Sequence, residues 1–127
     1  MIDGILSAIF TTFIYVFGGW DVALISLLIA IFIDYITGVL SAIYNKKLSS
    51  RTGLKGILKK VGYLCVVALS VVIDNITNET GIIRNLVIYF FVANDGISIL
   101  ENMSEMDIPL PKKLIEILDQ IRKENDE

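Results

Sequence analysis

The sequence contains no histidine and only one cysteine among its 127 residues. The absence of histidine removes the commonest general base and metal ligand of proteins. Cys65 has no second cysteine with which to form an intrachain disulfide, and its apolar neighbours predict a small buried hydrophobe. Glycine-rich phosphate-binding loops, HExxH and CxxC are also missing. We therefore expect a protein that is not an enzyme, with no catalytic residue, no cofactor and no bound metal.

Charged residues are scarce over long stretches, and these stretches define the predicted membrane domain. Hydrophobic residues make up 54% of the chain, and its mean hydropathy is +0.69. A helix of about 20 apolar residues crosses the hydrocarbon core of a bilayer. The sequence therefore predicts three transmembrane helices, over 22–44, 59–77 and 82–101. A soluble bundle is disfavoured because its helices need a polar face, and residues 22–33 offer only Ser26.

The first apolar segment, 4–20, is uncharged and short for a span. It either crosses the bilayer as a fourth transmembrane helix, or lies at the membrane interface with Trp20 as an aromatic anchor. The segment lacks the basic start and the small-residue cleavage site of a signal peptide. We therefore expect it to be retained.

The positive charges after the helix predicted at 22–44 set the expected orientation. Residues 45–60 contain no acid and six bases, which are Lys46, Lys47, Arg51, Lys55, Lys59 and Lys60. Short loops rich in lysine and arginine stay on the cytoplasmic side of a membrane. Residues 45–58 are thus predicted to form a basic cytoplasmic loop, with Lys59 and Lys60 reaching outward to the headgroups. Nucleic acid is not an expected partner, because this loop is short, pinned to the membrane and free of aromatic residues.

The C-terminal residues differ in composition from the rest, which divides the chain into a membrane domain at 1–104 and a tail at 105–127. Pro109 and Pro111 interrupt the helix after the last predicted span. Beyond them, apolar residues recur at helical spacing among charges, at Leu114, Ile115, Leu118 and Ile121. This pattern predicts a short amphipathic helix in a cytoplasmic tail. The helix either docks on its own protein or a neighbour, or takes a role at the membrane surface.

Each predicted transmembrane helix carries one aspartate, which is Asp34, Asp74 or Asp95. An ionised carboxylate near the bilayer centre costs about 2.5–3.5 kcal/mol even on lenient insertion scales, so these side chains need shelter from lipid. In the helix predicted at 22–44, small and polar residues recur every three or four positions, which places them on one side. We predict that the oligomer contacts or pore-lining positions are Asp34, Thr37, Gly38, Ser41, Asp74 and Asp95. Two interpretations stay open: helix–helix packing within or between protomers, and a wall that faces water in an assembled pore.

These features predict an all-α membrane protein with three to four transmembrane helices and an amphipathic C-terminal helix, assembled as a homo-oligomer in the lipid bilayer. A chain this small cannot enclose a protein-sized hole alone, so any large pore must form between protomers. On the residues alone, a small ion channel, a proton-coupled transporter and a passive membrane adaptor stay open as alternatives.

Two connected motifs resemble a known family. The span end Asp34-Tyr-Ile-Thr-Gly38 is followed by the basic stretch Lys46-Lys-Leu-Ser-Ser-Arg-Thr-Gly-Leu-Lys-Gly-Ile-Leu-Lys-Lys60. Together with 98–102 and 108–112, this pattern resembles the phage holin family that includes the clostridial toxin-secretion holins, from Ala30 to the C-terminus. Asp107 stands where the family pattern would place a glycine.

The resemblance implies a multi-pass protein of the bacterial cytoplasmic membrane that assembles into large oligomers and opens pores. Such pores release a wall hydrolase (an endolysin) in phage lysis, or a toxin that has no signal peptide. The implied partners are therefore the bilayer, further copies of the chain, and one of these two kinds of exported protein.

Overall fold

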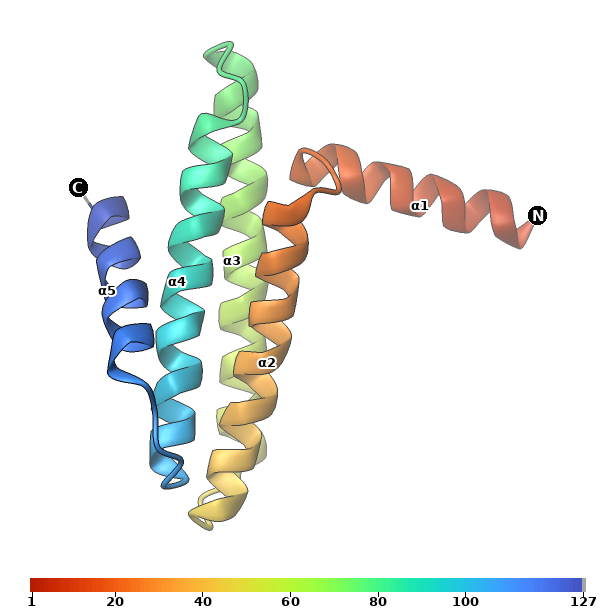
Figure 1. Cartoon of the computed structure of the whole chain (residues 1–127). Helices are drawn as coiled ribbons and strands as arrows, with labels where there is room; N and C mark the ends of the chain where they lie inside the picture. Colours follow the sequence, from red (N-terminus) through yellow and green to blue (C-terminus); the bar gives the residue numbers. More distant parts are fainter. Residues whose placement is uncertain (127) are drawn as a thin grey trace.

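The computed structural model describes residues 1–126, and all of their side chains except those at 121, 122 and 124–126. The described part is all-helical, as predicted. The helices in chain order are α1 (Ile2–Phe17), α2 (Val22–Tyr44), α3 (Ser50–Ile76), α4 (Ile82–Glu105) and α5 (Lys112–Asp126). Figure 1 shows that α2, α3 and α4 form an upright bundle, α1 projects sideways from it, and α5 lies along the side of α4.

Three helices are long and apolar enough to cross a membrane, namely α2 with 23 residues, α3 with 27 and α4 with 24. At 1.5 Å per residue they measure about 34 to 40 Å, which exceeds the hydrocarbon thickness of about 30 Å. By contrast, α1 has 16 residues, which makes it about 24 Å long. Its direction across the bundle (Figure 1) fits the interfacial placement better than the spanning one.

The first helix ends at Phe17, three residues before the predicted end at Trp20. Gly18 ends it in the left-handed conformation with φ of +82°, and the N–H of Gly19 donates to the carbonyl of Ile14 at 2.9 Å. A Cβ added at Gly18 would lie 2.7 Å from Nε of Arg84. Both the backbone angle and the approach of Arg84 therefore require glycine here.

The basic segment is shorter as a loop than the sequence predicts. α3 begins at Ser50, so the predicted loop at 45–58 is wrong beyond Ser49. The Ser49 hydroxyl caps the helix by accepting a hydrogen bond from the N–H of Thr52 at 3.2 Å. After this cap nothing stops the helix before the apolar run, so its early turns carry Arg51, Lys55, Lys59 and Lys60.

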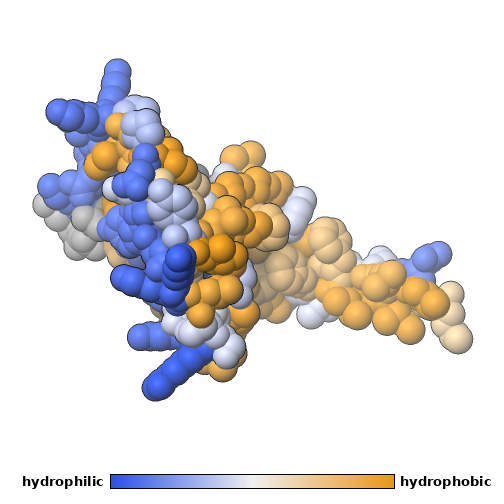
Figure 2. All heavy atoms as spheres, turned by 90° about the horizontal axis from the view of Figure 1, so that it is seen from below, coloured by the Kyte–Doolittle hydropathy of each residue, from blue (hydrophilic) through white to orange (hydrophobic). Residues whose placement is uncertain are grey.

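The bundle is apolar both inside and on much of its outer surface. Ala23, Leu27, Val67 and Ile88 form the buried core between α2, α3 and α4. Large side chains also point outward from each span, with Phe32 66%, Leu69 57% and Leu86 50% exposed. Figure 2 shows hydrophobic residues over the side from which α1 projects and hydrophilic residues toward the side of α5. Lipid, rather than water, is the solvent that such an outer surface suits.

The predicted amphipathic helix forms as α5 and packs against α4. A Cβ added at Gly96 of α4 would lie 3.1 Å from Cδ1 of Leu118, so the glycine forms a notch that this leucine fills. Leu114 and Ile115 stay 41% and 42% exposed. The side chain of Ile121 lies outside the described part, as does Glu127.

Candidate functional site

Three charged side chains from three helices meet inside the bundle. With Thr37 and Asn102 we call them the Lys60 cluster. Lys60 on α3 donates hydrogen bonds to Asp34 on α2 and to Asp95 on α4, the second at 2.7 Å. Asp95 is completely buried, and the Lys60 side chain is only 12% exposed. Within the described residues, Oδ2 of Asp95 has no hydrogen-bond partner, so two carboxylates depend on one ammonium group.

Aromatic rings close one side of this cluster. The Lys60 ammonium lies 4.8 Å from the centre of the Tyr63 ring, within cation–π range. Tyr63 stacks on Phe91 with 4.2 Å between the ring centres, and its hydroxyl accepts a hydrogen bond from Asn94 at 3.1 Å. These rings exclude water from the cluster on the side of α3 and α4, which strengthens the ion pairs.

The polar stripe of α2 continues from this cluster along α4. The Asn102 amide donates to the Thr37 hydroxyl at 2.9 Å and to the backbone and side-chain oxygens of Asp34 at 3.3 Å. One turn further, the Ser41 hydroxyl donates to the Glu105 carboxylate at 2.6 Å. Asp34, Thr37 and Ser41 on this side of α2 therefore each have a partner on α4, and such polar contacts join helices in lipid.

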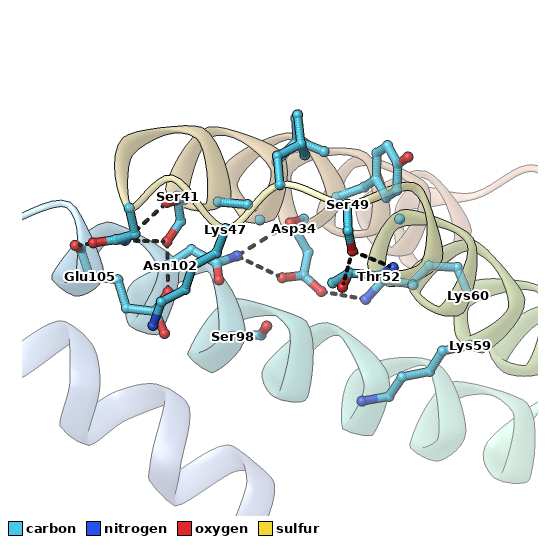
Figure 3. Close-up of a pocket in the computed structure, with 18 residues that line it drawn as sticks. Asp34, Ser41, Lys47, Ser49, Thr52, Lys59, Lys60, Ser98, Asn102 and Glu105 are labelled. Atoms are coloured by element: carbon cyan, nitrogen blue, oxygen red, sulfur yellow. Dashed lines mark hydrogen bonds and ion pairs between the residues drawn. The ribbon is translucent and has the colours of Figure 1, made fainter.

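An open groove of about 700 Å³ lies between α2 and the early turns of α3, beside the Lys60 cluster. Figure 3 shows Asp34, Lys60 and Asn102 meeting along it. Lys47 and Lys59 also line the groove. Within the described residues, no three His, Cys, Asp or Glu side chains converge as a metal site would need. The groove thus connects the buried ion pairs with the charged end of the bundle.

A second polar group, which we call the Arg84 cluster, joins α1, α2 and α4 at the opposite end. Arg84 is 4% exposed. Its guanidinium donates to both carboxylate oxygens of Asp21, at 2.8 and 3.0 Å. It also donates to the carbonyls of Phe17 at 2.6 Å and Gly19 at 3.2 Å. One side chain therefore holds the end of α1, the α1–α2 turn and the start of α4 together.

Asp74 on α3 caps the beginning of α4. The residue before that helix is Gly81, which has no side chain to cap it. The two carboxylate oxygens of Asp74 instead accept the N–H groups of Ile83 at 3.0 Å and Arg84 at 2.9 Å. A carboxylate at a helix N-terminus satisfies free donors and complements the helix dipole. This explains one of the three aspartates as a structural link between α3 and α4.

An apolar layer separates the two clusters. Leu27, Val67 and Ile88 meet between them and are completely buried. The nearby hydroxyl of Ser70 donates to the backbone carbonyl of Val67 at 2.5 Å, within its own helix. The bundle therefore contains polar groups near both ends and the apolar layer between them.

The pH dependence of the Arg84 cluster follows from Asp21, which lies just before α2. The hydrogen bonds from Arg84 lower the pKa of Asp21 below its ordinary value. A lowered pKa in the folded state adds stability above the ordinary value, about 3.9, and this contribution is lost as the pH falls through the lower pKa. We expect Asp21→Asn to lower the melting temperature in neutral detergent at pH 7, and the difference from wild type to shrink toward pH 3. Asp3→Asn, on exposed α1, is the control and should leave the melting temperature unchanged at pH 7 and at pH 3. A melting-temperature difference between Asp21→Asn and wild type that does not change with pH would contradict the prediction.

The structure buries five of the six predicted site residues inside one protomer, namely Asp34, Thr37, Ser41, Asp74 and Asp95, and half-buries Gly38 between α2 and α4. Their role as oligomer contacts or pore lining stays a prediction. Five of the six basic residues are exposed, and these are Lys46, Lys47, Arg51, Lys55 and Lys59. The expected outward direction of Lys60 is wrong, because two buried carboxylates attract its ammonium group inward.

Sequence reasoning missed Asp21, Lys60 and Arg84 as partners of the buried groups. A signal for two of them is present in the spacing. Lys60 precedes Tyr63, Val67, Ser70 and Asp74 at intervals of three and four, which places it on the buried face of α3. Arg84 shares a face of α4 with Asp95 and Asn102 in the same way. Extending each polar stripe to the helix ends would have found these groups.

A multi-span membrane protein with paired charges inside its bundle is the class that this fold and these clusters define. Residues 11–123 match the bacteriophage holin family, so the chain belongs to that family. The family consists of pore-forming proteins without enzymatic activity, and the chain is therefore not an enzyme.

Curated relatives match most of the chain, and one of those given below is named a probable holin. A 14.9 kDa uncharacterized protein from the nagH 3′ region of Clostridium perfringens is 45% identical over 87% of this chain and 85% of its own length. An uncharacterized protein of Listeria monocytogenes is 42% identical over 89% of the chain and 83% of its own length. A protein of Bacillus phage phi105 named a probable holin is 32% identical over 89% of the chain and 83% of its own length. No solved structure matches the chain.

Proposed function

We propose that the chain is a holin that oligomerises in the bacterial cytoplasmic membrane and opens pores wide enough for a folded protein. The observation that carries this proposal is the close-packed apolar layer inside the protomer. Leu27, Val67 and Ile88 fill the space between the two polar clusters, so one bundle offers no water-filled route. In a family of pore-forming proteins, the hole must then form between protomers.

The buried aspartates support assembly indirectly in this proposal. Asp34 and Asp95 are held by Lys60, and Asp74 is held by the first N–H groups of α4. These links fix the three spans relative to one another without leaving a charge in lipid. Thr37, Gly38 and Ser41 add close contact with α4. The protomer can thus present constant outer faces to its neighbours.

The orientation that we propose follows the exposed lysines and arginine. They gather at the end of the bundle that holds the α2–α3 loop, and that end faces the cytoplasm by the positive-inside rule. α4 ends there too, which puts the start of the tail on the cytoplasmic side. α1 then lies along the external interface, with Trp20 beside Phe10 in an edge-to-face contact at 5.6 Å.

The cargo that we propose is a wall hydrolase released during phage lysis, with a toxin that lacks a signal peptide as the alternative. The phage relative named a probable holin supports the lysis setting. A small ion channel or proton-coupled transporter would need a polar route through the protomer, and the apolar layer argues against one.

Inducible expression in bacteria tests the proposal directly. The measurement follows release of a cytoplasmic reporter protein and of potassium from the same culture. We expect both to leave the cells together, because a hole between protomers is not limited by the packing of one bundle. Potassium loss with complete retention of the reporter would instead support a small channel. Intact cells at high expression would support a passive adaptor.

A further inference from the structure

α5 lies along α4 at a depth that hydrocarbon would occupy around a lone protomer. Leu118 fills the notch at Gly96, and Gly96 lies nine residues before the end of α4, about 14 Å inside the bundle. The rest of α5 continues in the same direction (Figure 1) through residue 126, for about another 12 Å. α5 thus runs beside most of a hydrocarbon core that is about 30 Å thick.

The outer face of α5 is charged at this depth. Glu116 is exposed, and Lys123 pairs with Asp119 at 3.2 Å while its side chain stays 73% exposed. Figure 2, which looks onto the charged end of the bundle, shows hydrophilic residues toward the side of α5. The opposite side carries outward-pointing Phe32 and Leu69. One flank of the protomer suits lipid and the other suits water.

From this division we infer that the charged outer face of α5 faces water in the assembled pore, so that α5 lines the lumen. The inference rests on the proposed pore between protomers. A ring of protomers places the apolar faces of α2 and α3 toward lipid and the charged face of α5 toward the hole. In a lone protomer surrounded by lipid, exposed charges oppose this position, and α5 moves to the headgroup layer. Docking of α5 on α4 therefore accompanies assembly.

Locking α5 onto α4 tests whether the docked position belongs to the open pore. The variant is Cys65→Ser with Gly96→Cys and Leu118→Cys. Shortening the leucine removes the atoms that a Cβ at position 96 would meet, since Cδ1 and Cδ2 of Leu118 lie at 3.1 and 3.2 Å. Oxidation in expressing cells joins the two cysteines, and the reduced form of the same protein is the matched control. We expect the oxidised form to release at least half as much reporter protein as the reduced form.

Water access to the docked helix is measured in the same background. Glu116→Cys is included in the same variant; oxidation joins the two cysteines that face each other at positions 96 and 118 and leaves the cysteine at the exposed position 116 as a free thiol. A membrane-impermeant maleimide applied outside should label it at least tenfold faster after pore opening than before. The wild-type chain supplies the control. The prediction that Cys65 is buried in the protein is wrong, because this cysteine is exposed on the outer face of α3 between apolar residues, where it should stay unlabelled in lipid.

Three results would overturn the inference while leaving the proposed function intact. The first is release of the reporter protein by the reduced form but not by the oxidised, locked form. In that case α5 would have to leave α4 for the pore to open. The second is a locked, releasing pore in which the cysteine at position 116 stays unlabelled. The third is an open pore in which the lock never forms. Failure of the proposed function looks different, because then the reduced form itself releases no reporter.

Discussion

The Lys60→Met variant is expected to lose about 3–5 kcal/mol of unfolding free energy, the usual penalty for removing one partner of a buried ion pair. Methionine keeps the length and the apolar part of the side chain but carries no charge. Asp34 and Asp95 would then face each other without the ammonium that both now contact. Asp95 has no exposed surface through which water could replace it. The variant should therefore also accumulate poorly in the membrane and release little reporter protein.

Unfolding by SDS titration from mixed micelles measures this loss. Lys59→Met is the matched control, because Lys59 is the adjacent lysine, is exposed, and lies at the same groove. It should change the free energy of unfolding by no more than about 0.5 kcal/mol. The triple variant Asp34→Asn, Lys60→Met and Asp95→Asn removes all three charges and should recover most of the loss. Equal effects of the two lysine replacements would show that the ion pairs do not hold the bundle together.

The spans themselves were predictable because membrane helices leave a strong local signal. About 20 consecutive apolar residues admit few other structures, and α2 matches its predicted bounds at Val22 and Tyr44. The polar stripe of α2 was also readable, since the three-to-four spacing follows from helix geometry alone. The start of α3 was harder to locate. A basic segment resembles a loop in composition, whereas the cap at Ser49 decides where the helix begins.

The charge partners were not predictable by the same local reasoning. Lys60 is 26 residues from Asp34 and 35 from Asp95, and a lysine near a helix end ordinarily extends toward the headgroups. Its inward direction depends on where two other helices place their carboxylates. The position of α5 is likewise a tertiary result, because a charged tail after two prolines carries no signal that it turns back along α4. Local periodicity predicts which face of each helix is polar, but not which partner that face meets.

The distribution of these partners explains how a chain with buried charges tolerates lipid. The Lys60 cluster lies next to the groove at the charged end of the bundle, and the Arg84 cluster lies where α1 and α2 meet. Only the apolar layer of Leu27, Val67 and Ile88 occupies the middle. Among the described residues, each buried charge thus has a partner on another helix or in the α1–α2 turn, and the most hydrophobic depth of the bilayer meets hydrophobic side chains.

Replacing Arg84 with methionine is expected to free α1 from the bundle and to destabilise the protein by about 3 kcal/mol, a typical loss for buried hydrogen bonds of a charged group. The guanidinium contacts two carboxylate oxygens and two backbone carbonyls at once. Arg84→Lys should recover only part of this, because an ammonium group cannot reproduce the planar fork that binds Asp21 through two hydrogen bonds.

Trp20 reports this change because it is the only tryptophan in the chain and lies in the α1–α2 turn. In the folded protein it packs against Phe10 of α1. Once Arg84 no longer holds the carbonyls of Phe17 and Gly19, the turn loosens, and Trp20 fluorescence in lipid vesicles should become more sensitive to a soluble quencher. Arg51→Met removes an exposed arginine from the early part of α3 and should leave both quenching and stability unchanged. Quenching of Arg84→Met equal to that of wild type would contradict the prediction. It would mean that apolar contacts with α3, rather than the arginine, hold α1. Release of the reporter protein should then also equal that of wild type.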